Sequence, residues 1–74
     1  MTTHQVTYRG PSIFAVRAAA LLADAAGVEL TSATKVDTPA DTAELAMTVE
    51  GTDEAVVAAV EAVRAELPAG ATLD

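Results

Sequence analysis

The stretch TAELAMTVEGTDEAVVAAVEAVRAEL, residues 42–67, decides the fold because its apolar repeat changes from two residues to a helical spacing at one glycine. From Thr42 to Glu50 apolar and polar side chains alternate. Strict alternation predicts a strand with one buried face. That face carries Ala43, Leu45, Met47 and Val49, and the other carries Thr42, Glu44, Ala46, Thr48 and Glu50.

A helix is predicted directly after this strand. Gly51 ends the strand, Thr52 is placed as an N-cap, and the acidic Asp53 and Glu54 favour the positive end of a helix dipole. The apolar side chains then follow helical spacing and form one stripe, made of Val56, Val60, Val63 and Leu67. Pro68 to Gly70 ends the helix, and Ala71 to Asp74 is expected either to add a short last strand or to fray.

The preceding half of the chain has the same strand and helix order. Residues Thr3 to Arg9 alternate as a strand, Gly10-Pro11 interrupts it, and Ser12 is a suitable N-cap for a helix from Ile13 to about Ala26. Gly27 is expected to end that helix.

A second strand, Val28 to Val36, follows, and its Val28, Leu30, Ser32, Thr34 and Val36 are expected on one face. The turn sequence DTPAD, residues 37–41, makes the second and third strands an antiparallel hairpin. The order is therefore βαββα with a final β. It predicts an α+β, ferredoxin-like fold in which residues 1–74 form one domain, with an antiparallel sheet and two helices on one face.

Composition excludes several classes of function. The chain has 74 residues, no Cys, and 11 Asp and Glu against 4 Lys and Arg, for a formal net charge of −7. This charge repels nucleic acid and anionic membranes, so neither is an expected partner. The chain has no run of about 18 apolar residues for a membrane span. Its amino terminus lacks the basic and apolar segments of a signal peptide, so we expect a cytoplasmic location.

Catalytic and metal-binding patterns are also missing from the sequence. His4 is the only histidine and has no cysteine near it, so a structural role is favoured over a functional one. The Asp53-Glu54 pair is interpreted as helix-start chemistry. We therefore expect no catalytic residue, no metal site and no cofactor.

The joint between the first strand and the first helix is the best candidate for a ligand site. Its sequence, RGPS, ends at a helix N-terminus whose backbone amides favour a carboxylate or phosphate. The candidate residues are the amides of Gly10, Ser12 and Ile13, with charge from Arg9 or Arg17. The alternative is a tight turn followed by a capped helix.

Two further surfaces are candidates for partners. In the first helix Phe14, Ala18, Leu21, Leu22 and Ala25 are expected to pack on the sheet, whereas Ala15, Val16, Ala19, Ala23 and Ala26 face outward as a nearly uncharged interface. The alternative is that alanine only raises helix propensity. The open sheet face, which meets solvent or a basic partner, is expected to carry Gln5, Thr7, Glu29, Thr31, Glu44, Thr48 and Glu50.

The segment Gly10 to Val36 resembles the first half of an ACT domain. The resemblance is carried by the Gly-Pro turn, by the helix end LLADAAG, residues 21–27, and by the strand start Val28-Glu29-Leu30. It implies a small βαββαβ regulatory module that binds amino acids or similar ligands between paired domains. The chain departs from the family in its ligand loop, where Gly10-Pro11-Ser12 replaces a longer Asp-x-x-Pro-Gly-like sequence.

The last strand and helix are also similar to those of histidine phosphocarrier proteins. The phosphorylatable histidine that should open the first helix is absent, and Phe14 stands nearby instead. We therefore expect a non-enzymatic, ACT-like regulatory or interaction module that forms a homodimer or docks to a larger protein and takes an amino-acid-like ligand. The alternative is a protein-binding adaptor or accessory subunit without a small-molecule ligand.

Overall fold

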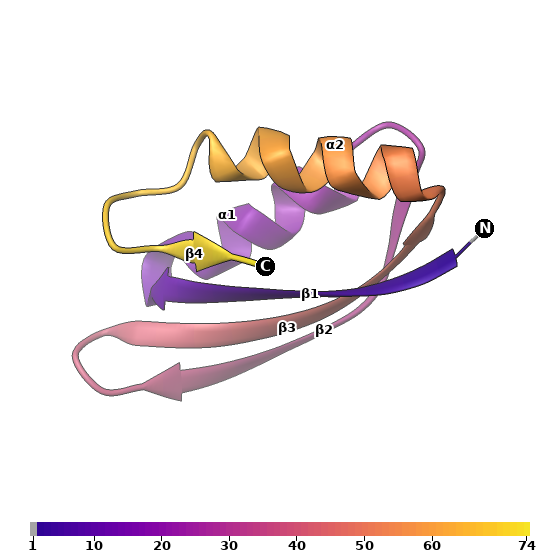
Figure 1. The fold of residues 1–74 in the computed structure, drawn as a ribbon. Helices are drawn as coiled ribbons and strands as arrows, with labels where there is room; N and C mark the ends of the chain where they lie inside the picture. Colours follow the sequence, from indigo (N-terminus) through magenta and orange to yellow (C-terminus); the bar gives the residue numbers. More distant parts are fainter. Residues whose placement is uncertain (1) are drawn as a thin grey trace.

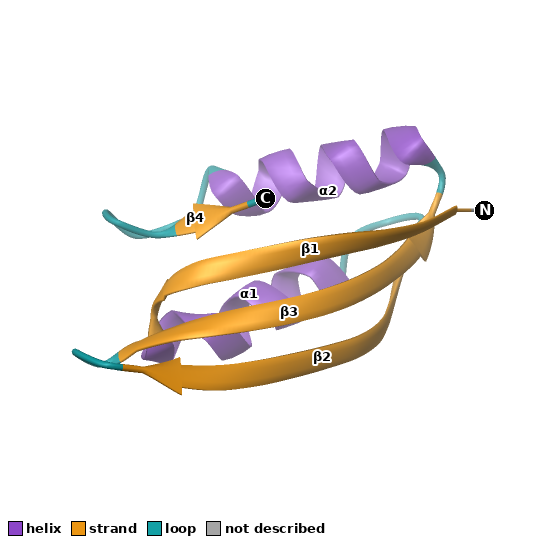
Figure 2. Ribbon diagram, turned by 60° about the horizontal axis from the view of Figure 1, so that its bottom comes forward, coloured by secondary structure: helices purple, strands orange, loops and turns teal. Residues whose placement is uncertain are grey.

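The computed structural model describes residues 2–74 and folds them into four strands and two helices. The elements are β1 (Thr2–Pro11), α1 (Ser12–Ala23), β2 (Val28–Thr38), β3 (Thr42–Gly51), α2 (Asp53–Arg64) and β4 (Thr72–Leu73). The strands form one antiparallel sheet in the order β2-β3-β1-β4, and both helices cover the same face of it (Figures 1 and 2). The predicted α+β class is confirmed, and the arrangement is compatible with a ferredoxin-like fold.

Strand β3 holds the centre of the sheet. It pairs with β1 along its whole length, from Thr42↔Pro11 to Gly51↔Thr2, and with β2 along its other edge. Its buried side chains are Ala43, Leu45, Met47 and Val49, which confirms the alternation read from the sequence. The two helices pack on this buried face, with Ala15, Ala18 and Leu22 from α1 and Val56, Ala59 and Val63 from α2.

Strand β2 differs from its prediction beyond Leu30. Leu30 lies opposite Val49 on the core face, but the register shifts between Leu30 and Ser32. Because an irregularity of this kind reverses the alternation, the core-side positions after it are Ala33, Lys35 and Asp37. The expected shared face was therefore wrong for its second half, and the residues that move to the open face are Ser32, Thr34 and Val36.

Helix α1 begins one residue earlier and ends sooner than predicted. Pro11 is the N-cap residue and makes no side-chain cap bond, so the prediction of Ser12 as N-cap was wrong. The helix ends at Ala23, and Gly27, with a φ of 77°, makes the turn into β2. At α2 the predicted cap is confirmed, because the Thr52 hydroxyl oxygen accepts a hydrogen bond from the Ala55 N–H at 3.2 Å.

The β2–β3 hairpin turns through two residues in a left-handed conformation. Ala40 has a φ of 64° and Asp41 a φ of 58°. Two-residue hairpin turns of this hand favour glycine and asparagine, since a Cβ atom in this region meets backbone oxygens. A turn is thus confirmed within the predicted residues 37–41, although Asp37 and Thr38 belong to β2, and Ala40 adopts its conformation at a cost.

Ala40→Gly is expected to raise the free energy of unfolding by about 0.5–1 kcal/mol because relief of the left-handed strain exceeds the added flexibility of the unfolded chain. The matched control is Ala58→Gly on the exposed side of α2, which should lower stability by about 0.5–1 kcal/mol. Urea unfolding followed by circular dichroism measures both. A loss of stability in Ala40→Gly contradicts the strain.

Candidate functional site

The five residues predicted to bind a ligand lie on two sides of the sheet. Arg9 is on the open face, where its Nε donates to the Glu44 carboxylate at 2.9 Å. This hydrogen bond, with the charge of Glu44, raises the pKa of Arg9. Arg9 and Gly10 line a shallow hollow of about 280 Å³ together with Thr38, Thr42, Ala43, Glu44 and Gly70.

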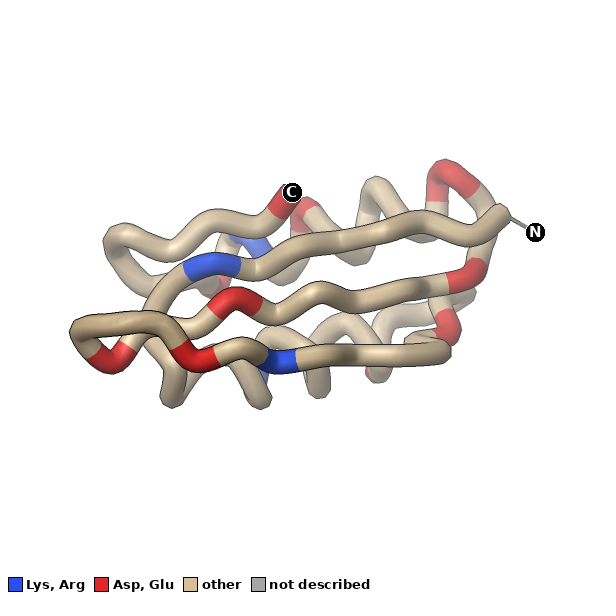
Figure 3. The backbone as a smooth tube through the Cα atoms, turned by 90° about the horizontal axis from the view of Figure 1, so that it is seen from below, with Lys and Arg blue, Asp and Glu red and all other residues tan. Residues whose placement is uncertain are grey.

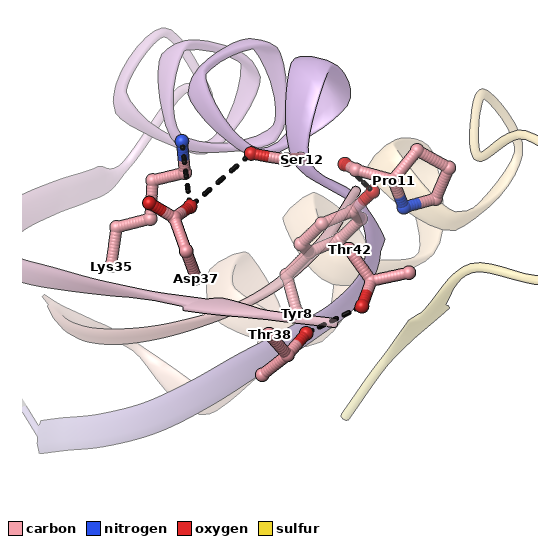
Figure 4. Close-up of polar contacts among 7 residues, drawn as sticks. All are labelled: Tyr8, Pro11, Ser12, Lys35, Asp37, Thr38 and Thr42. Carbon is pink, nitrogen blue, oxygen red and sulfur yellow. Dashed lines mark hydrogen bonds and ion pairs between the residues drawn. The ribbon is translucent and has the colours of Figure 1, made fainter. Parts of the chain in front are cut away.

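Of the other three candidates, Ser12 and Ile13 lie at the start of α1, whereas Arg17 is exposed in the middle of the helix. The Ser12 N–H donates to the Asp41 carbonyl at 2.8 Å, and the Ser12 hydroxyl donates to the Asp37 carboxylate at 3.4 Å. Figure 4 shows Asp37 between Ser12 and Lys35, whose Nζ lies 3.4 Å from the same carboxylate oxygen. Ile13 is 93% exposed. The first amide of the helix is thus occupied, and a carboxylate stands beside it.

A buried tyrosine joins the end of β1 to the structure around it. Tyr8 has no exposed surface, and its hydroxyl donates to the Pro11 carbonyl at 2.9 Å (Figure 4). Its ring packs against that of Phe14. A Cβ atom on Gly10 would come within 2.8 Å of the Tyr8 hydroxyl and 2.7 Å of Ala71 Cβ, so this position requires glycine. Burial raises the pKa of Tyr8. This network was missed at the sequence level because Tyr8 was assigned only to the core.

Of the five residues predicted to form an exposed interface on α1, some are exposed and others are not. Ala15 is completely buried and belongs to the core, because its side chain points at the sheet. Val16 is 69% exposed, Ala23 is exposed, Ala19 is partly buried, and Ala26 is exposed in the turn after the helix. The residues Ser12, Val16, Ala19 and Ala23 follow helical spacing along one side. Since Ser12 contacts Asp37, this side, here called the α1 flank, lies toward the outer edge of β2.

The outer edge of β2 adjoins this flank. β2 is an edge strand of 11 residues, and every residue from Thr31 to Thr38 is exposed. A long edge strand presents a row of backbone N–H and C=O groups that can pair with another strand. Val36, on the open face, is 57% exposed. The sequence did not indicate this surface because its alternation suggested a half-buried strand.

The open face of the sheet carries its predicted glutamates, but they do not lie in its middle. Figure 3 shows that charged residues lie toward the ends of the long strands and leave the middle uncharged. The middle carries Gln5, Thr7 and Thr48, whereas Glu29, Glu44 and Glu50 lie nearer the strand ends. Thr31 differs from the prediction, because it lies at the register shift and its hydroxyl donates to the Thr48 carbonyl at 3.0 Å.

Metal-binding and membrane-spanning features are absent from the described part of the chain. Between residues 2 and 74 no three His, Asp or Glu side chains are grouped closely enough to hold a metal ion. Neither helix of this region is long and apolar enough to cross a membrane. No protein-family model and no curated protein matches this chain.

The pKa of Tyr8 gives a pH-dependent prediction. The unfolded chain ionises its tyrosine near pH 10, whereas the folded chain keeps the proton to a higher pH. The stability contributed by Tyr8 is therefore complete below about pH 10 and is lost as the pH rises above it. Because Tyr8 is the only tyrosine, absorbance titration at the phenolate band measures it directly. A midpoint at or below the value of free tyrosine contradicts the burial of the hydroxyl.

Proposed function

We propose that this chain is a non-enzymatic interaction module of ferredoxin-like fold that forms a homodimer through the outer edge of β2 and the α1 flank. One observation carries the proposal: a long, exposed edge strand runs directly beside a helix side whose exposed residues are uncharged. Strand and helix side together offer backbone pairing and close packing to a second copy of the same chain.

Charge along β2 suggests how two copies align. Lys35 and Asp37 lie on the same face, one residue on either side of Val36. An antiparallel pairing with its two-fold axis at Val36 sets Lys35 opposite Asp37 of the partner subunit, and Asp37 opposite Lys35 of the partner subunit. Opposite charges directly across a strand pair are favourable. On the open face Val36 contacts Val36 of the partner subunit.

The helices support the same arrangement. Because Ser12 lies beside Asp37, the first turns of α1 are close to the proposed two-fold axis. Val16 and Ala19 then face the partner's helix, and their small side chains allow helix axes to approach to about 8–10 Å. Burial of Val16, now 69% exposed, contributes about 1–2 kcal/mol per subunit.

A regulatory role with an amino-acid-like ligand is the second candidate function. The resemblance to ACT domains favours it, and so does the hollow beside Arg9, where the hydroxyls of Thr38 and Thr42 accompany a guanidinium. Thr38 is at the end of the proposed β2 pairing, so the hollow lies next to the dimer interface. The adaptor alternative uses the same β2 edge for a larger protein.

Light scattering on a size-exclusion column should show a dimer whose fraction rises with concentration. Val16→Glu is expected to give a monomer, because it inserts two like charges into the helix contact. Val57→Glu is the matched control, since Val57 is also an exposed helical valine, 56% accessible, but lies on α2. A strict monomer at millimolar wild-type concentration contradicts the proposal.

Charge exchange tests the register. Lys35→Asp alone is expected to weaken the dimer by about five- to tenfold, since two favourable cross-strand pairs become repulsive. The double variant Lys35→Asp, Asp37→Lys should recover most of the affinity, because the opposite charges face each other again. Analytical ultracentrifugation measures the three dissociation constants. No recovery in the double variant rules out this register.

Thermal shift against the free amino acids tests the ligand. A ligand at 100 times its dissociation constant stabilises the fold by about 2.7 kcal/mol. The shift should disappear in Arg9→Ala and persist in Arg17→Ala, which removes an arginine that does not line the hollow. If no amino acid shifts the wild-type transition, the adaptor function is favoured.

A further inference from the structure

The opposite edge of the sheet is incompletely covered. β4 has two residues and pairs with Tyr8 and Arg9 of β1, and Asp74 extends this pairing to Thr7. Figure 1 shows β4 ending partway along β1, with the amino-terminal half of β1 continuing past it. Between residues 2 and 74 no strand covers that half of the edge.

The backbone of this open half is oriented for pairing. Thr7 and Asp74 exchange two hydrogen bonds, with N···O distances of 2.9 and 3.0 Å. Along an antiparallel strand every second residue directs both its N–H and its C=O to the same edge. Thr3 and Gln5 therefore direct theirs to the same edge as Thr7, where the next residues of a longer β4 would lie. Both residues are exposed.

A groove continues the line of β4 between β1 and α2. It is a hollow of about 230 Å³ that includes Val6 of β1, Val56 and Val60 of α2, and Asp74 at the end of β4. A second hollow on the outer side of α2 shares Val57 and Glu61 with it. An extended segment in this groove would cover apolar side chains of α2 while it pairs with β1.

The rim of the groove is acidic. Glu61 and Asp74 line the groove itself, and the adjoining hollow on the outer side of α2 adds Asp53 and Glu54. The guanidinium of Arg64 already donates to the Leu73 carbonyl at 2.7 Å, and His4 Nε2 lies 3.0 Å from the Asp53 carboxylate. Within the described chain Glu54 and Glu61 form no ion pair.

We infer that this groove binds an extended segment of a different protein, which adds to β1 as a strand antiparallel to it and carries apolar residues flanked by Lys or Arg. The apolar residues cover the valines of α2, and the basic residues face Glu54 and Glu61. Strand addition of this kind takes affinity from main-chain hydrogen bonds and specificity from side-chain pockets.

A second copy of this chain is a poor occupant on charge grounds. The chain has only 4 Lys and Arg, and three of them, Arg9, Lys35 and Arg64, already lie against carboxylates. A second copy therefore offers few free cations to the carboxylates of this acidic rim. The inference is independent of the proposed dimer, which uses the other edge of the sheet.

Labelled peptides test the groove by fluorescence anisotropy on the full chain. The probe KKVTVTKK should bind, with an affinity that falls as salt rises, and EEVTVTEE should not bind. Glu61→Lys is expected to weaken the binding of KKVTVTKK by about tenfold, because an attraction between opposite charges becomes a repulsion on the exposed side of α2. Equal binding of the two peptides overturns the inference.

Backbone pairing is tested separately. Gln5→Pro removes the N–H directed to the open edge and should weaken the binding of KKVTVTKK by about tenfold. Gln5→Ala should leave that affinity unchanged. In nuclear magnetic resonance spectra of the wild type, the amide resonances of Thr3 and Gln5 should shift when the probe binds. Their hydrogen exchange with water should also become slower. The inference fails if these amides are unaffected, or if Gln5→Pro changes the oligomeric state instead of peptide affinity.

Discussion

The buried face of β3 is the constraint on which the rest of the structure depends. Ala43, Leu45, Met47 and Val49 must leave water together, and one sheet face packed under two helices achieves this. Because β3 pairs with a strand on each side, it also fixes the register of β1 and β2. The outer edges of β2 and β1 are the consequence, since residues 2–74 contain no further long strand to cover them.

The two edges differ in charge, and this difference separates their proposed partners. The β2 edge carries Lys35 beside Asp37 and is self-complementary, which suits a second copy. The β1 edge faces the carboxylates of α2, which suits a basic segment. A molecule with both contacts would be a dimer that displays two grooves, one in each subunit.

Much of the fold follows from local patterns in the sequence, whereas the surfaces do not. The alternation in β3 and the cap at Thr52 identify a strand and a helix start because each depends on neighbouring residues. The register shift at Leu30 depends on pairing with β3, so the face of Val36 could not be read from β2 alone. The surroundings of the predicted ligand residues also depend on distant parts of the chain. Asp37 and Asp41 reach the start of α1 from a distant hairpin.

The central claim is that the β2 edge joins two copies of the chain. Amide hydrogen exchange of β2 at two protein concentrations tests it most directly. If the edges pair, the outward amides among residues 34–38 exchange slowly in concentrated solution and faster after dilution. The amides of Thr3 and Gln5 exchange at the same rate in both. Fast exchange along β2 at every concentration would contradict the dimer.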